Sequence, residues 1–230
     1  MSGPILHLGI LAGLRSEARC LSPHLPPDLK VTLALSGARR DGALGGAAKL
    51  IAAGATHLLS FGLAGGLDPE LPAGTLLLPR AILTETGGSF AVEAGWHARL
   101  LAMQPDAETA PRLGVDRAIA TAADKSARRR TGAAAIDMES HILAAAAANA
   151  GRPFLVIRAI CDPADAALPP AALVGVTAAG GTDMPAILGS LLRRPGQLPA
   201  LLALGRSAAL AERTLAACAR KIVSSLVPVQ

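Results

Sequence analysis

The sequence predicts a single α/β domain in which helices cover a parallel sheet, and three observations support this prediction. Short apolar runs typical of buried strands alternate with helix-forming segments, which is the pattern of a parallel sheet with crossover helices. A chain of 230 residues is long enough for one sizeable core, and 51% of it is hydrophobic, so disorder is not expected. Aromatic residues make up only 2% of the chain, so the core must be largely aliphatic.

The stretch from residue 135 to residue 163 shows this pattern most clearly. An alanine-rich helix in this stretch ends at Gly151 and Pro153, because glycine suits a helix C-terminus and proline prevents continuation. The apolar run Phe154–Ile157 that follows is typical of a central parallel strand. We therefore expect the rest of the chain to be organised around this helix and strand.

Three charged residues border the same helix and strand. Glu139 precedes the helix, and Arg158 and Asp162 follow the apolar run. Parallel sheets bind ligands beyond the carboxyl ends of their strands, so we expect these side chains to project towards one edge. Two carboxylates and a guanidinium there suit a polar, partly charged reactant, but a capping carboxylate with a structural ion pair explains them equally well.

The remaining elements follow from apolar runs and from the glycine and proline residues between them. Further strands are expected at Ile5–Leu11, Val31–Leu35, His57–Phe61, Thr75–Leu78, Ala81–Leu83, Gly87–Val92, Gly114–Thr121 and Ala133–Ile136. Further helices are expected after Gly13 and over Asp41–Ala53, Trp96–Met103, Met184–Arg194, Leu198–Arg206 and Ser207–Leu226. Residues 1–230 are thus expected to form one domain, with 184–230 as a helical, basic C-terminal extension.

Two glycine-bearing segments lead to the expected site edge. Gly13 permits a tight turn into a helix whose early turn contains Glu17, where an acid also interacts favourably with the helix N-terminus. The cluster Gly62–Leu67 matches neither GxGxxG nor a Walker loop, so a dinucleotide or nucleoside triphosphate site is unsupported. Backbone without Cβ atoms can lie against a ligand, and a tight structural turn explains the cluster almost as well.

The net charge of +5 resides entirely in the C-terminal part of the chain. After Asp183 there are six basic side chains and one acid, whereas residues 1–183 are neutral. This distribution argues against a uniformly basic nucleic-acid-binding protein. Arg206, Arg213 and Arg220 are seven residues apart, so they fall near one helix face. Such a region could lie on an anionic membrane, or its helices could dock on the sheet with the arginines in water.

The three cysteines, Cys20, Cys161 and Cys218, are widely spaced and lack CxxC or zinc-site spacing. Without a signal peptide, they are expected to be reduced thiols in a cytoplasmic protein. Cys161 lies beside Asp162, where a packing role is favoured over a nucleophilic one. The uncharged interval Leu50–Leu67 is interrupted by glycines, so a membrane-spanning helix is not expected there.

Four segments occur in the order found in a known superfamily and cover most of residues 5–166: GILAGLRSEA, SGARRDGALGGA, FGLAGGLDPELPAGTLLLP and AIDMES followed by FLVIRAICDPAD. Together they resemble the purine nucleoside phosphorylase/nucleosidase superfamily, and the pair MES plus RAxxD is the most specific part. The arrangement is similar to the 5′-methylthioadenosine/S-adenosylhomocysteine nucleosidases. The GLRSEA start, the short interval from Asp124 to Glu139 and the Leu/Arg/Pro-rich tail resemble the related hopanoid-associated phosphorylases.

The resemblance implies a three-layer α/β/α sandwich around a mixed, distorted central sheet, in a homo-oligomer. It implies cleavage of the N-glycosidic bond of an adenine nucleoside, either by hydrolysis or by phosphorolysis with phosphate as co-substrate. The favoured reaction converts adenosylhopane to ribosylhopane, or its phosphorylated form, and adenine in hopanoid biosynthesis. No metal or organic cofactor is implied. A cytoplasmic protein is expected, with peripheral contact at the inner membrane face through its C-terminal helices.

Two alternatives to this reading remain open. One is a soluble 5′-methylthioadenosine/S-adenosylhomocysteine nucleosidase, and the other is a non-catalytic purine-nucleoside-binding protein. The joint presence of Glu17, Glu139 and Asp162 argues against the second alternative.

The resemblance also implies a role for each matching residue. Asp162 corresponds to the acid that protonates the departing purine, Glu17 to the acid that orients water, and Arg158 to the arginine that fixes the glutamate and the nucleophile. Substrate-binding positions are Glu139 at the ribose hydroxyls, Met138 against the sugar, and Ala64 and Gly65 as backbone passing the ribose. These roles fit chemistry that needs a better leaving group and a stabilised oxocarbenium-like sugar.

Three departures from the family pattern bear on these roles. Lys125 and Ser126 stand where an aromatic residue commonly stacks on the base, so Phe154 or aliphatic side chains are expected to sandwich adenine. Cys161 replaces the usual serine or threonine beside the acid. Glu17 is an anion that repels phosphate unless Arg15, Arg39 or Arg158 compensates, which favours water as the nucleophile.

Overall fold

A mixed sheet of nine strands forms the centre of the computed structural model, which describes residues 6–222. The strand order is β2-β1-β3-β8-β7-β5-β6, and β9 pairs with β3 and β4. The strands are β1 (His7–Ala12), β2 (Lys30–Leu35), β3 (His57–Gly66), β4 (Leu76–Leu77), β5 (Ala81–Thr84), β6 (Ser89–Ala91), β7 (Arg112–Gly114), β8 (Ala135–Asp137) and β9 (Phe154–Asp162).

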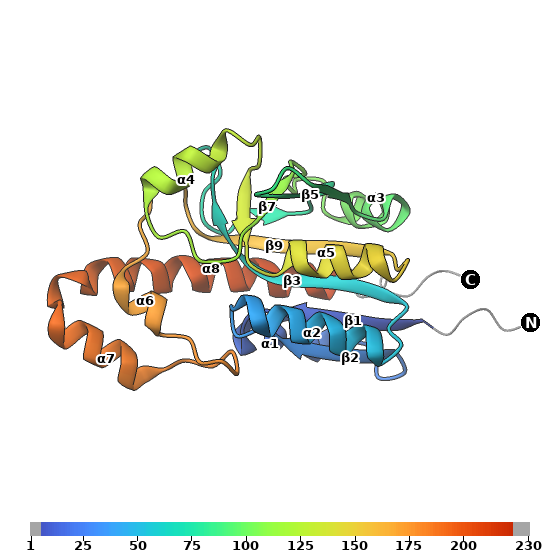
Figure 1. The fold of residues 1–230 in the computed structure, drawn as a ribbon, viewed down its shortest axis with the longest axis horizontal. Helices are drawn as coiled ribbons and strands as arrows, with labels where there is room; N and C mark the ends of the chain where they lie inside the picture. The colour runs from blue at the N-terminus through green and yellow to red at the C-terminus, as the bar shows by residue number, and fades with distance from the viewer. Residues whose placement is uncertain (1–5, 223–230) are drawn as a thin grey trace, which may run out of the picture.

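Helices cover both faces of this sheet, which confirms the predicted α/β sandwich (Figure 1). They are α1 (Arg15–Leu21), α2 (Arg40–Ala52), α3 (Ala94–Met103), α4 (Ala122–Arg129), α5 (Ser140–Asn149), α6 (Pro170–Val174), α7 (Met184–Arg193) and α8 (Leu198–Ile222), with 3-10 turns at Ser22–His24 and Pro195–Gln197. Helix α2 packs beside α5 on one face, and α8 packs against β9 and α1 on the other. The main core between them is largely aliphatic, as expected from the composition.

Strand β3 joins the two halves of the sheet because it pairs with different strands along its length. Its first half lies parallel to β1, and nearly its whole length lies parallel to β9. The register with β9 shifts between Ala64 and Gly65, and the end of β3 pairs antiparallel with β8. This places the ends of β3, β8 and β9 together. Most of the Gly62–Leu67 cluster continues the strand, so the alternative explanation of it as a tight turn is wrong.

The region between β7 and α4 differs from the prediction. A strand was expected over Gly114–Thr121, but β7 ends at Gly114. Val115 and Ile119 leave the sheet because they are buried in a separate small core cluster. The Thr121 hydroxyl then accepts a hydrogen bond from the backbone of Asp124 and caps α4, which contains most of the basic segment after it.

The C-terminal region is one long helix where two were predicted. Helix α8 continues through Gly205, because an isolated glycine weakens a helix without ending it. The end of the predicted helix Ser207–Leu226 and the last residues of the predicted extension lie outside the described residues. Helix α6 was not predicted. No helix within residues 6–222 is long and apolar enough to cross a bilayer.

Helix α8 has two parts with different surroundings. In its second part Ala211, Leu215, Cys218 and Ala219 are buried in the main core, whereas in its first part Leu202 is 53% exposed. We expect Leu215→Ala to lower the free energy of unfolding by about 2–5 kcal/mol, because it leaves a cavity in the core. The matched change Leu202→Ala should alter it by less than about 0.5 kcal/mol in urea denaturation. Equal losses would show that the first part is packed as tightly as the second.

Candidate active site

Four predicted site residues meet where β1, β3, β8 and β9 end. Glu17 lies in α1 after β1, Glu139 lies between β8 and α5, and Arg158 and Asp162 lie on β9. All four are at least nine-tenths buried. The sequence placed Arg158 beyond its strand, but β9 runs on to Asp162, so the guanidinium projects from within the sheet.

The guanidinium of Arg158 contacts groups from three parts of the chain. Its Nη2 donates to the Ser60 hydroxyl at 2.6 Å, and its Nη1 donates to the Leu63 carbonyl at 3.2 Å. The same Nη2 lies 3.2 Å from the Glu139 carboxylate and 3.4 Å from that of Asp137. Burial alone would lower the pKa of Arg158, but nearby carboxylates outweigh it and raise the pKa.

Glu139 is held at both of its carboxylate oxygens. Oε2 faces Arg158, and Oε1 accepts a hydrogen bond from the Ser36 hydroxyl at 2.8 Å. The Asp137 carboxylate fixes the backbone here by accepting from the amides of Glu139 and Ser140. Glu139 is thus presented at the start of α5 as an oriented acceptor, suited to hydroxyl donors on a ligand.

Asp137 and Arg112 form a second buried ion pair behind Glu139. Their charged groups are 3.3 Å apart, and Arg112 also donates to the Ile136 carbonyl. Burial raises the pKa of Asp137, but Arg158 and Arg112 outweigh it and lower the pKa to about 2. Burial lowers the pKa of Arg112 to about 10. Asp137 is therefore a permanent anion that orients the groups around it.

Glu17 is bound by the backbone at three points. Its Oε2 accepts from the amides of Gly13 at 2.6 Å and Leu14 at 2.9 Å, and its Oε1 accepts from Leu63 at 2.8 Å. A Cβ atom at Gly62 would lie about 2.5 Å from this carboxylate, so only glycine fits there. Burial raises the pKa of Glu17 to about 7, and Glu139 adds to the shift while Arg158 opposes it. Glu17 can therefore gain or lose a proton near neutral pH.

Asp162 lies at the other end of the site beside a lysine. The Lys125 ammonium is 2.8 Å from Oδ2, and the Cys161 thiol donates to Oδ1 at 3.0 Å. Burial raises the pKa of Asp162, and Lys125 opposes this shift. Burial also raises the pKa of Cys161 well above its usual value, so this thiol is a poor nucleophile. A Cβ atom at Gly65 would approach the Asp162 carboxylate to 3.0 Å.

The other predicted binding residues have different positions. Ala64 and Gly65 line the end of β3 beside Asp162, and Met138 packs against a small core cluster next to Glu139. Phe154 does not belong to the site. It is buried in the core at the start of β9, eight residues from Asp162, which is about 26 Å along an extended strand. The prediction that Phe154 stacks on a base is wrong because β9 is longer than expected.

Two of the three predicted cations are engaged elsewhere. Arg39 pairs with Asp41 at the surface. Arg15 donates from its side chain to the Ala179 carbonyl and from its backbone to the Gly180 carbonyl. The loop 177–181 therefore lies against the start of α1. Of the three predicted cations, Arg158 is the one whose charge acts on Glu17 and lowers its pKa.

Sequence reasoning missed the supporting residues of the site. Ser36, Ser60 and Arg112 carried no motif, since only the fold brings them to the carboxylates. Asp137 could have been found, because an aspartate just before a helix commonly caps its first amides. Among residues 6–222 no group of histidine, cysteine or acidic side chains could hold a metal ion.

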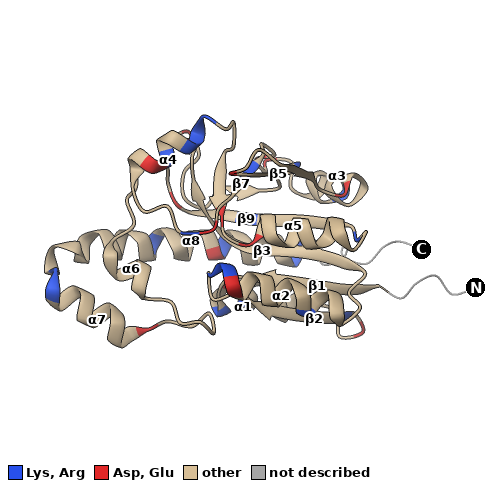
Figure 2. Ribbon diagram, viewed as in Figure 1, with Lys and Arg blue, Asp and Glu red and all other residues tan. Residues whose placement is uncertain are grey.

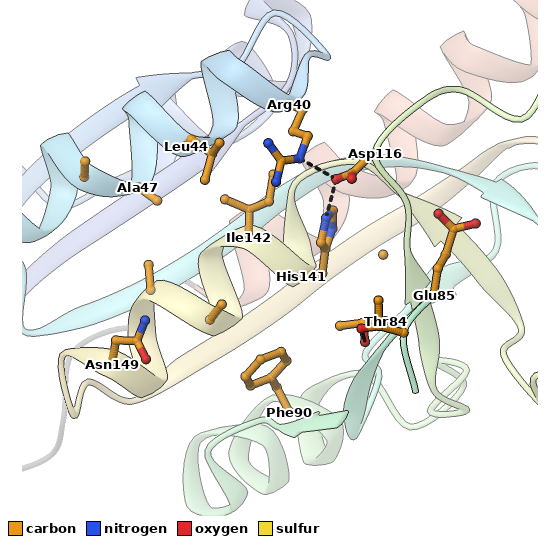
Figure 3. Close-up of a pocket in the computed structure, with 15 residues that line it drawn as sticks. Arg40, Leu44, Ala47, Thr84, Glu85, Phe90, Asp116, His141, Ile142 and Asn149 are labelled. Carbon is orange, nitrogen blue, oxygen red and sulfur yellow. Dashed lines mark hydrogen bonds and ion pairs between the residues drawn. The ribbon is translucent and has the colours of Figure 1, made fainter. Parts of the chain in front are cut away.

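A cavity of about 480 Å³ lies apart from these residues, between α2, α5 and the β5–β6 region (Figure 3). On its wall the Asp116 carboxylate accepts from Arg40 at 2.9 Å and contacts His141 at 3.2 Å. None of the predicted site residues lines it. The carboxylate cluster, and not this cavity, is therefore the candidate active site.

Comparison with known families finds a match for part of the chain. Residues 104–193 match the sequence profile of the Phosphorylase superfamily. The chain is similar to that superfamily over this segment. It includes Lys125, Glu139, Arg158 and Asp162, whereas Glu17 lies outside it. No curated protein sequence matches the chain.

Solved structures share the fold over nearly the whole chain. The 5′-methylthioadenosine/S-adenosylhomocysteine nucleosidase from Neisseria meningitidis, in complex with methylthio-immucillin-A, has a TM-score of 0.73 at 16% identity, covering 95% of this chain and 99% of that one. The S-adenosylhomocysteine nucleosidase from Streptococcus pyogenes, in complex with 5-methylthiotubericidin, has a TM-score of 0.73 at 16% identity and covers 100% of both. The futalosine hydrolase of Helicobacter pylori has a TM-score of 0.72 at 15% identity, covering 96% and 98%. These likenesses establish the nucleosidase fold.

The raised pKa of Glu17 predicts a pH-dependent stability. Between about pH 4.5 and about 7 the carboxyl group of Glu17 is protonated more fully in the folded chain than in the unfolded chain. The contribution of Glu17 to the free energy of unfolding therefore falls as the pH rises. We expect Glu17→Gln to lose less stability than the wild type between about pH 5 and pH 8, measured by urea denaturation. Glu70→Gln, at an exposed position, is the control and should follow the wild type. Parallel losses in all three proteins would contradict the assignment.

Proposed function

We propose that the protein cleaves the N-glycosidic bond of an adenine nucleoside. The observation that carries this proposal is the arrangement of Asp162 and Glu17 as buried carboxyl groups with raised pKa values, around the oriented Glu139. The superfamily match and the nucleosidase fold support an enzyme of this type. The structural relatives named above include nucleosidases in complex with methylthio-immucillin-A and with 5-methylthiotubericidin, which supports a nucleoside substrate.

In the proposed reaction the two ends of the site have opposite tasks. The Asp162 carboxyl group gives its proton to N7 of the purine, the bond between the sugar C1′ and N9 breaks, and its electron pair leaves with the base. Glu139 accepts hydrogen bonds from the ribose hydroxyls and stabilises the oxocarbenium-like sugar. Glu17 takes a proton from water as the water attacks C1′. Division of acid and base between two carboxyl groups is the general logic of glycoside cleavage.

Water is the proposed nucleophile, with phosphate as the alternative co-substrate. A phosphate ion at Glu17 would face that carboxylate and Glu139, while Arg158 already contacts both Asp137 and Glu139. Arg15 and Arg39 are bound to other groups, as described above. Repulsion between like charges in a buried site therefore favours hydrolysis over phosphorolysis. No metal or organic cofactor enters the proposed reaction.

The proposed substrate is a lipid-linked nucleoside, adenosylhopane in hopanoid biosynthesis, and the C-terminal hairpin of α7 and α8 supports this choice. Eight of the nine exposed large hydrophobic residues within the described chain lie between Leu173 and Leu210. Met184, Leu188 and Leu192 form a stripe on α7 at helical spacing. Arg193 and Arg194 follow at the turn, which is blue in Figure 2.

Exposed leucines next to arginines suit peripheral contact with an anionic membrane, where a lipid substrate would reside. We therefore infer a cytoplasmic protein at the inner membrane face. The second candidate is a soluble 5′-methylthioadenosine/S-adenosylhomocysteine nucleosidase, which the shared fold with such enzymes favours. A homo-oligomer stays a prediction, which light scattering in solution would test.

The catalytic proposal predicts that Asp162→Asn lowers kcat by about 10²–10⁴-fold with little change in KM, because the acid acts in the transition state. The measurement is adenine release from adenosylhopane and from methylthioadenosine, each with and without phosphate. Asp165→Asn, at an exposed position three residues later, is the matched control and should keep full activity. Unchanged turnover in Asp162→Asn, or a wild type that binds adenine but releases none, would overturn the proposal. A need for phosphate would make the reaction phosphorolysis.

The membrane proposal predicts that the protein floats with phosphatidylglycerol-containing vesicles and that the double variant Leu188→Glu with Leu192→Glu does not. Both side chains are at least half exposed, so the fold should be unaffected. Turnover of adenosylhopane in vesicles should fall, whereas turnover of methylthioadenosine should stay constant. Equal losses on both substrates would assign the hairpin a structural role. Rapid turnover of methylthioadenosine alone would favour the soluble nucleosidase.

A further inference from the structure

We infer that Lys125 is a positioning residue for Asp162, holding Oδ2 of the acid so that Oδ1, which accepts only from the Cys161 thiol, serves the departing base. This inference rests on the proposed glycosidic cleavage. Lys125 reaches the acid from α4, whereas Asp162 ends β9, so the contact joins segments 37 residues apart. The position is the one at which the sequence suggested a missing aromatic side chain.

The Lys125 ammonium is fully enclosed and surrounded by oxygen atoms. It lies 2.8 Å from Asp162 Oδ2 and donates to the backbone carbonyls of Asp162, Pro163 and Ala166 at 3.2, 2.7 and 2.9 Å. Its side chain is 0% exposed. Four acceptors around a group with three N–H donors leave no capacity for water. The ammonium therefore fixes both the acid and the turn that follows it.

A purely structural role at this position would not need a buried charge. Burying an ammonium is costly unless it is paired, and an aliphatic side chain of the same length could fill this space. The three carbonyl contacts alone would fix the turn after β9. The fourth contact places the ammonium beside the Asp162 carboxyl group, which gives up its proton in the proposed reaction. The ion pair therefore affects that proton transfer.

The cation acts on the proton that Asp162 gives away. When the O–H bond of the acid breaks and the N7–H bond forms, a carboxylate is left in a buried site. Lys125 stabilises that carboxylate as it develops, without moving, which is electrostatic preorganisation. The other titratable group facing Asp162 is the Cys161 thiol from β9, which stays protonated and donates to Oδ1. Helix α4 is anchored by ion pairs of Arg128 with Glu85 and of Arg129 with Asp68.

The test is the pH profile of kcat/KM for adenine release by Lys125→Met, compared with the wild type. The protonated acid is required, so activity falls on the alkaline side as Asp162 loses its proton. Without the cation the carboxyl group holds its proton to higher pH, so the alkaline limb should move to higher pH. The value of kcat should fall by about 10- to 100-fold, part of the 10²–10⁴-fold of general acid catalysis, with KM little changed.

Two further variants separate this role from a structural one. Arg129→Met removes a surface ion pair from the same helix and should leave the pH profile unmoved. Lys125→Arg keeps the positive charge, so the alkaline limb of its pH profile should stay in place even if kcat falls. This variant provides the test if Lys125→Met does not fold. A lower rate at every pH with an unmoved limb in Lys125→Met, or a moved limb in Lys125→Arg, would overturn the inference. If Asp162→Asn abolishes release and the limb stays unmoved, the inference fails and the proposed function stands.

Discussion

The guanidinium of Arg158 is the contact on which the rest of the candidate site depends. It leaves the middle of β9 and bonds to Ser60 and Leu63 of β3 and to the carboxylates of Asp137 and Glu139. Without it, Glu139 would be buried with no cation in contact with its carboxylate, a state that costs several kcal/mol. The apolar sequence of β9 holds the arginine in place, so hydrophobic burial of the strand positions the charges.

Two carboxylates at the ends of this site are buried to a similar degree but have different partners. Glu17 is bound by backbone amides, which carry no net charge, whereas Asp162 is bound by the ammonium of Lys125. Burial favours the protonated form of both groups. Backbone amides oppose this effect at Glu17, whereas the Lys125 ammonium opposes it at Asp162. Environments that give two acids different pKa values are a common way to divide acid and base roles in one site.

Much of this arrangement could be predicted from the sequence, because strong local patterns fix β1, α2, α5 and β9. Glu139 and Asp162 were found because they border such elements. Lys125 and Ser36 were not assigned to the site, since only tertiary packing brings them to the carboxylates. Phe154 was misplaced for a related reason: local sequence marks where a buried strand begins, but its length depends on the neighbouring strand β3.

The loop 177–181 packs against the start of α1, the helix that carries Glu17. It closes over the start of α1 through two hydrogen bonds from Arg15, and Gly37 packs directly beneath the Ala178 carbonyl. Hydrogen bonds within the loop, such as that from the Thr177 amide to the Gly181 carbonyl, keep its own shape, so the contacts with Arg15 can break separately. Local opening of this loop would expose the start of α1 without unfolding the sheet.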